Sequence, residues 1–94
     1  MACSGGSAGP PTVSELGRKA GCVGLRKIDG TTALEAAKCK VNGGAVYFAT
    51  FTTNEWRDSV NPPGVLIYGD RWIVAVSRGD DAAELADILG GKVR

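Results

Sequence analysis

Apolar and polar residues recur along this chain at the spacings of short helices and strands. Thr12 and Glu15 form a capping box in front of apolar residues at helical spacing, which predicts a helix that ends at Gly21. Residues 23–28 then read as a short strand, because the Asp-Gly pair at 29–30 is a turn signal. The chain is therefore predicted to open with a helix followed by a strand.

The next segment is predicted to form one side of a hairpin. Residues 33–37 would also fit a helical turn, but apolar residues between 37 and 41 alternate with Lys38 and Lys40. That alternation favours a strand with both lysines facing outward. The Asn-Gly-Gly sequence at 42–44 predicts a tight turn, since Asn and Gly tolerate a positive φ angle.

The sequence AVYFATF at 45–51 is apolar on both faces of a strand, which predicts a central position in the sheet. A second capping box at 52–55 predicts a helix in which Trp56 and Val60 stack one turn apart. The Asn-Pro-Pro-Gly sequence at 61–64 ends this helix.

The last third of the chain predicts a second hairpin and a third helix. Strands at 65–68 and 72–77 are joined by a short turn at 69–71. Asp80 or Asp81 then caps a helix with an apolar stripe. The members of this stripe are Ala82, Leu85, Ala86 and Leu89. The order α-β-β-β-α-β-β-α favours an α+β fold, an antiparallel five-stranded sheet with helices packed mainly on one face.

The first eleven residues differ in composition from the remainder. After Cys3 comes a run of Ser, Gly, Ala and Pro that offers no side chain for a core, so we expect residues 1–11 to be a flexible tether and residues 12–94 to be a single domain. A small residue, a cysteine and a Gly/Ser/Pro linker resemble the mature start of a bacterial lipoprotein. This resemblance implies lipidation at Cys3 and attachment to a membrane through that lipid.

The other two cysteines are candidates for a disulfide. Cys22 follows the predicted end of a helix and Cys39 lies in a predicted strand, with 16 residues between them. A bridge between them would stabilise the domain by about 3 kcal/mol in the chain-entropy model. The alternative is two reduced cysteines buried as small apolar residues.

Residues 39–93 carry a more specific resemblance. A cysteine-containing strand, a strand ending in Thr50, a helix with Trp56, a Gly-x-x-Trp hairpin at 69–72 and a closing helix before Leu-Gly-Gly-Lys-Val resemble the small secreted lipoproteins of actinobacteria. The resemblance implies a disulfide and an extracytoplasmic location on the outer face of the cell membrane. It implies no catalytic residue.

Composition excludes several function classes. The 94 residues contain no histidine, which excludes a Ser-His-Asp triad, a Cys-His pair and histidine-ligated zinc. The net charge of +1 gives no basis for nucleic-acid binding. Six of the eleven cationic residues precede residue 47, against three acidic ones. This mild asymmetry is typical of a solvated face or of a domain oriented towards an anionic envelope surface. No metal site or cofactor is expected.

The predicted sheet has more apolar surface than three short helices cover. Trp56 and Trp72 are expected to fill the layer between helix and sheet. An apolar binding face is expected to include Tyr47, Phe48, Tyr68 and Trp72. The sequence thus favours a binding or interaction module for an envelope protein or a small ligand, with a weak homodimer as one form of contact. The alternatives are a small envelope enzyme or enzyme inhibitor with an unrecognised site, and a structural surface protein without a ligand.

Overall fold

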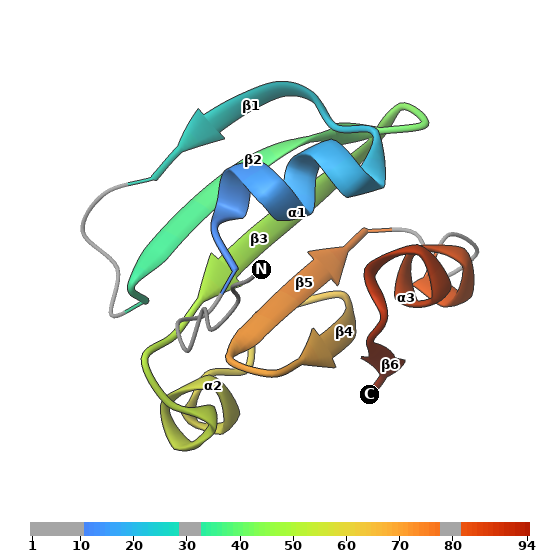
Figure 1. The fold of residues 1–94 in the computed structure, drawn as a ribbon. Helices are drawn as coiled ribbons and strands as arrows, with labels where there is room; N and C mark the ends of the chain where they lie inside the picture. Colours follow the sequence, from blue (N-terminus) through green and yellow to red (C-terminus); the bar gives the residue numbers. More distant parts are fainter. Residues whose placement is uncertain (1–10, 29–32, 78–81) are drawn as a thin grey trace, which may run out of the picture.

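The computed structural model describes residues 11–28, 33–77 and 82–94. Cys3, Asp80 and Asp81 lie outside these residues. Within these residues, three helices and six strands follow one another (Figure 1). They are α1 (Val13–Ala20), β1 (Val23–Lys27), β2 (Glu35–Val41), β3 (Gly44–Thr50), α2 (Asn54–Ser59), β4 (Val65–Gly69), β5 (Trp72–Val76), α3 (Ala82–Leu89) and β6 (Lys92–Val93).

The strands form one antiparallel sheet in the order β1-β2-β3-β5-β4-β6. The α+β class and the antiparallel sheet are confirmed, but the sheet has six strands where the sequence predicted five. The missed strand, β6, contains only two residues and pairs with Ile67 and Tyr68 of β4. Two residues are too few to produce a periodicity, so this strand leaves no signal in the hydrophobic pattern.

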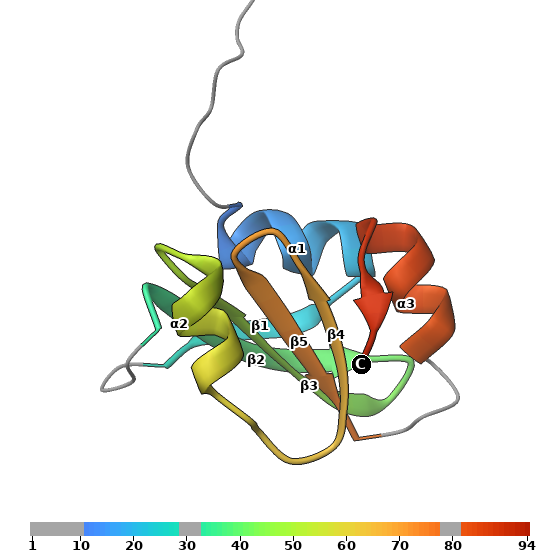
Figure 2. The same cartoon turned by 90° about the horizontal axis from the view of Figure 1, so that it is seen from below.

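One face of the sheet is covered by α1 and α3, which lie side by side above it in Figure 2. The capping box of Thr12 and Glu15 begins α1, and Gly21 ends it in the left-handed conformation. The apolar stripe of α3 is buried at all four predicted positions. Phe48 and Trp72 belong to this first core, where they pack beneath the two helices.

The opposite face of the sheet carries a second, smaller apolar cluster. Phe51, Leu66 and Ile73 are its largest buried members, and Val60 packs against them from the segment after α2. Neither α1 nor α3 contributes a residue to this cluster. The second face is thus covered by chain segments without a packed helix of their own, which leaves part of it open.

Two expectations for α2 are wrong. The capping box expected at 52–55 does not form, because the residue that caps α2 is Thr53, whose hydroxyl accepts a hydrogen bond from the Trp56 backbone. In addition, no residue of the helix is buried. Trp56 is 53% exposed and does not lie between helix and sheet. A helix of six residues offers barely more than one turn for an apolar stripe, and α2 lies at the end of the sheet instead of across it (Figure 1).

The disulfide between Cys22 and Cys39 is confirmed, with 5.9 Å between the Cα atoms. It joins the residue after the α1 cap to the middle of β2, and thereby holds α1 on the first face. Among the described residues there is no helix with the length and apolar character needed to cross a bilayer.

Candidate functional site

An apolar groove of about 430 Å³ lies on the second face of the sheet. Its floor is formed by Ala45 and Tyr47 of β3 and Ala75 of β5. One wall is formed by Pro62 and Pro63, in the segment between α2 and β4. A volume of this size is typical of sites for small organic ligands.

The groove exists because two of its three floor residues, Ala45 and Ala75, have short side chains that leave space beneath the wall. Successive strand residues point to opposite faces, so Ala45 and Ala75 reach the second face while their larger neighbours fill the first core. Gly64 lets the wall segment approach β5, since a Cβ there would lie 2.6 Å from the Val76 carbonyl oxygen. Pro62 and Pro63 have fixed φ angles, which makes this wall stiff.

The strand register places five residues in one row across the second face. Arg26 of β1 pairs with Lys38 of β2, Lys38 with Tyr47 of β3, Tyr47 with Ala75 of β5, and Ala75 with Leu66 of β4. The row therefore passes from two cations through a phenol to apolar side chains. Directly opposed residues of an antiparallel sheet have Cβ atoms about 5 Å apart, so neighbouring members interact.

The cationic end of this row is wider than two residues. Lys40 also points to the second face and pairs with Ala45 at the groove floor. Arg26, Lys38 and Lys40 are all exposed, and within the described ranges none of them takes part in an ion pair. Lys27, by contrast, lies 3.5 Å from Glu35. Half of the cations in the basic first part of the sequence thus gather beside the groove.

Tyr47 stands between the cationic and the apolar parts of the groove. It is half-buried, and burial raises the pKa of its phenol. The hydroxyl therefore stays protonated at neutral pH and can donate a hydrogen bond to a ligand.

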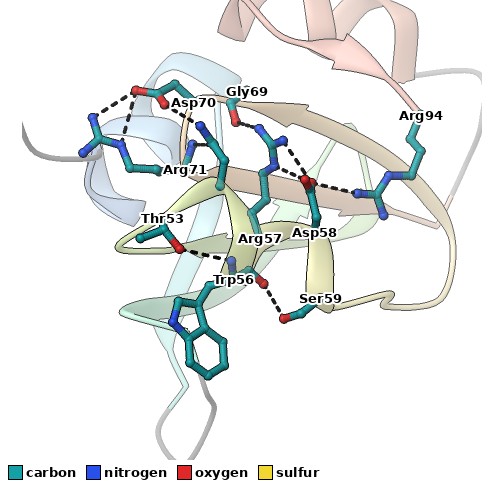
Figure 3. Close-up of polar contacts among 10 residues, drawn as sticks. Thr53, Trp56, Arg57, Asp58, Ser59, Gly69, Asp70, Arg71 and Arg94 are labelled. Atoms are coloured by element: carbon teal, nitrogen blue, oxygen red, sulfur yellow. Dashed lines mark hydrogen bonds and ion pairs between the residues drawn. The ribbon is translucent and has the colours of Figure 1, made fainter.

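A polar cluster fixes α2, and with it the start of the groove wall (Figure 3). The Arg57 guanidinium donates a hydrogen bond of 2.5 Å to the Gly69 carbonyl and forms an ion pair of 2.9 Å with Asp58. Asp58 also lies 3.6 Å from Arg94 near the end of the chain. These contacts hold the helix that leads directly into Val60 and the wall segment.

The first turn of α2 is held by the turn between β4 and β5. The Asn54 side chain accepts a hydrogen bond of 2.7 Å from the Arg71 backbone and donates one of 3.1 Å to Asp70. Hydrogen bonds from Arg71 and from Asn54 lower the pKa of the Asp70 carboxyl. These contacts join neighbouring parts of the same fold, which gives the cluster a structural role.

The four residues expected to form one apolar binding face do not share a face. Tyr47 lines the groove, whereas Phe48, its chain neighbour, is fully buried in the first core. Tyr68 is on the second face, where Arg57 lies 5.0 Å from its ring centre. Trp72 is buried in the first core. Because successive side chains of a strand point to opposite faces, Tyr47 and Tyr68 lie on the second face whereas Phe48 and Trp72 lie on the first.

Sequence reasoning did not identify Lys38, Ala75 or the proline pair as parts of a site. Lys38 and Tyr47 had a usable signal, because a two-residue turn at 42–43 fixes the hairpin register and places them opposite each other. No comparable signal in the sequence predicts that Pro62 and Pro63 form a wall of the groove. Its position depends on α2 and Gly64, which are far from Ala75 in the sequence.

Comparisons of this chain with protein-family models, with curated proteins and with solved structures gave no match. The described residues contain no group of three or more side chains suited to hold a metal ion.

Proposed function

We propose that this domain is a binding module whose ligand occupies the apolar groove on the second face, and that it is anchored outside the cytoplasm through a lipid on Cys3. The observation that carries the binding proposal is a groove of about 430 Å³ on the second face, lined mainly by apolar side chains. An apolar groove with a few polar groups at one end is the usual form of a small-molecule site.

The proposed location is supported by the disulfide between Cys22 and Cys39. Disulfides persist in oxidising compartments and are rare in the cytosol. Lipidation at Cys3 rests on the sequence around that residue alone. Intact-mass measurement of the exported protein tests it, since a diacylglycerol or acyl mass on Cys3 is expected and an unmodified Cys3 would remove the anchor from the proposal.

A hydrolytic enzyme is the alternative, with Ser77 as nucleophile and Lys38 as base, because both line the groove. Nucleophilic catalysis requires the two groups within hydrogen-bond reach. The described contacts include no hydrogen bond between them. Binding is therefore favoured over catalysis.

The binding proposal is tested with an uncharged apolar fluorophore, N-phenyl-1-naphthylamine. Fluorescence enhancement that saturates at one molecule per chain is expected for the wild type. Ala45→Leu fills the groove floor at an exposed strand position and should lower the affinity about tenfold. Ala83→Leu adds the same side chain at an exposed position of α3 and should leave it unchanged. Equal affinities in the two variants would place the fluorophore elsewhere and contradict the proposal.

A further inference from the structure

Resting on the proposed function of the groove, we infer that its ligand is a single-chain amphiphile with a carboxylate head group, of the fatty-acid class. The head lies against Arg26 and Lys38, and the hydrocarbon chain runs over Tyr47 and Ala75 towards Pro62.

One end of the groove is positively charged. Arg26, Lys38 and Lys40 project from two adjacent strands on the same face, and the register places Arg26 opposite Lys38. Like charges directly opposite each other on a sheet are unfavourable. No carboxylate of the described residues neutralises them. An anion bound between them relieves this repulsion, and Arg and Lys are strong donors to a carboxylate.

The remainder of the groove is apolar. Beyond Tyr47 the floor and walls come from alanine, proline, valine and phenylalanine residues, with Ser77 as the polar exception. Covering this surface requires a hydrocarbon body, because each buried methylene contributes about 0.8 kcal/mol to binding. The ligand therefore joins an anionic end to an unbranched or slender apolar end.

A second copy of this chain fits this face less well than an anionic amphiphile. A symmetric dimer with its two-fold axis near Lys38 would bring the cations of one protomer towards the same cations of the other. It would also leave Lys38 and Lys40 buried without partners, which is costly. A weak homodimer, if formed, uses another surface.

Tyr47 connects the two halves of the site. Its protonated phenol donates a hydrogen bond to the head group, and its ring continues the apolar floor. A single residue thus marks the position where the head ends and the chain begins.

The experiment compares three ligands with the same hydrocarbon chain: dodecanoate, dodecanol and dodecyltrimethylammonium. Each displaces N-phenyl-1-naphthylamine from the folded protein at low ionic strength and below its critical micelle concentration. We expect dodecanoate to bind about tenfold more tightly than dodecanol and the cation to bind most weakly. This preference should decrease as salt is added, because exposed charges are screened.

The matched variants are the double substitution Arg26→Gln, Lys38→Gln and the control Lys19→Gln, whose side chain is exposed on α1 across the sheet. The double variant should lose the preference for dodecanoate, so that dodecanoate and dodecanol bind to it with similar affinity. The control should keep the preference.

Equal binding of dodecanoate and dodecanol to the wild type would overturn the inference while leaving the groove as an apolar site. Failure of all three ligands and of the fluorophore to bind would overturn the proposed function as well. Binding to anionic phospholipid vesicles without displacement of the fluorophore by dodecanoate would overturn the inference in favour of a membrane-surface contact.

Discussion

The guanidinium of Arg57 lies over the ring of Tyr68, with 5.0 Å between its central carbon and the ring centre. The same side chain donates to the Gly69 carbonyl and pairs with Asp58. Arg94 approaches Tyr68 from the chain end at 5.9 Å. A helix in which no residue is fully buried is thus fastened to the sheet by Arg57, whose side chain is only 12% exposed.

Arg57→Ala should destabilise the domain by about 2 kcal/mol, because it removes a charged hydrogen bond and a cation–π contact. Because α2 leads into the groove wall, affinity for an apolar fluorophore should fall as well. Urea unfolding and fluorophore titration measure the two effects. Arg57→Lys keeps the charge but not the planar fork, and should recover part of the stability. An Arg57→Ala variant as stable as the wild type would show that α2 is held by other contacts.

Thr50→Val should leave the free energy of unfolding unchanged or raise it by about 1 kcal/mol. Thr50 is completely buried, and its hydroxyl has no hydrogen-bond partner in the described structure. An unsatisfied buried hydroxyl is costly, and valine has the same shape without it. Thr50→Ser is the control, since it keeps the hydroxyl and loses a methyl group, and it should destabilise. A loss of stability in Thr50→Val would indicate a hydrogen bond to that hydroxyl.

Local signals in the sequence were sufficient for most elements. The capping box at Thr12 and the left-handed Gly21 appear where they were expected, and the turn expected at 42–44 occupies 42–43, with Gly44 already in β3. The hairpin register follows from that turn. The buried stripe of α3 follows from helical periodicity. These features depend on steric and hydrogen-bonding preferences that the local sequence already contains.

The errors arise where distant segments decide the outcome. Trp56 was expected in the core, but the turn at Asp70 and Arg71 holds α2 at the end of the sheet, where the indole is exposed. The strand β6 exists because β4 offers an unpaired edge. The groove depends on the distance between Pro62 and the sheet. None of these relationships has a signature within a single segment.

Gly91→Ala should destabilise the domain by about 2 kcal/mol or more. A Cβ at this position would lie 2.5 Å from the Trp72 ring and 2.6 Å from the Tyr68 carbonyl oxygen. Both neighbours are held by the sheet, so the clash forces a shift in a packed core. Gly17→Ala is the comparison, because its Cβ would meet Cys22 and Leu25 at 3.4 Å and alanine favours the helix. Trp72 fluorescence in a Trp56→Phe background, followed during urea unfolding, reports both variants.

The Asp70 carboxyl should titrate below its usual range in the folded protein. The hydrogen bond from Arg71 is the main reason its pKa is lowered, followed by the one from Asn54. A lowered folded-state pKa contributes stability above the unfolded-state value, and this contribution disappears as the pH falls through the folded-state value. Asn54→Ala should shift the Asp70 titration upward in carboxyl NMR spectra, whereas Asn61→Ala should not. An unchanged midpoint in Asn54→Ala would contradict the assigned cause.

Removal of the disulfide should cost about 3 kcal/mol of unfolding free energy, because Cys22 and Cys39 are 17 positions apart and the bridge restricts the unfolded chain over that interval. The double variant Cys22→Ala, Cys39→Ala measures this loss in urea. The bridge also holds the end of α1 against β2, on the face opposite the groove. Where the double variant remains folded, its affinity for N-phenyl-1-naphthylamine should therefore match that of the wild type. A stability equal to that of the wild type would contradict the entropic argument, and a lost affinity in a folded variant would show that the two faces of the sheet are coupled.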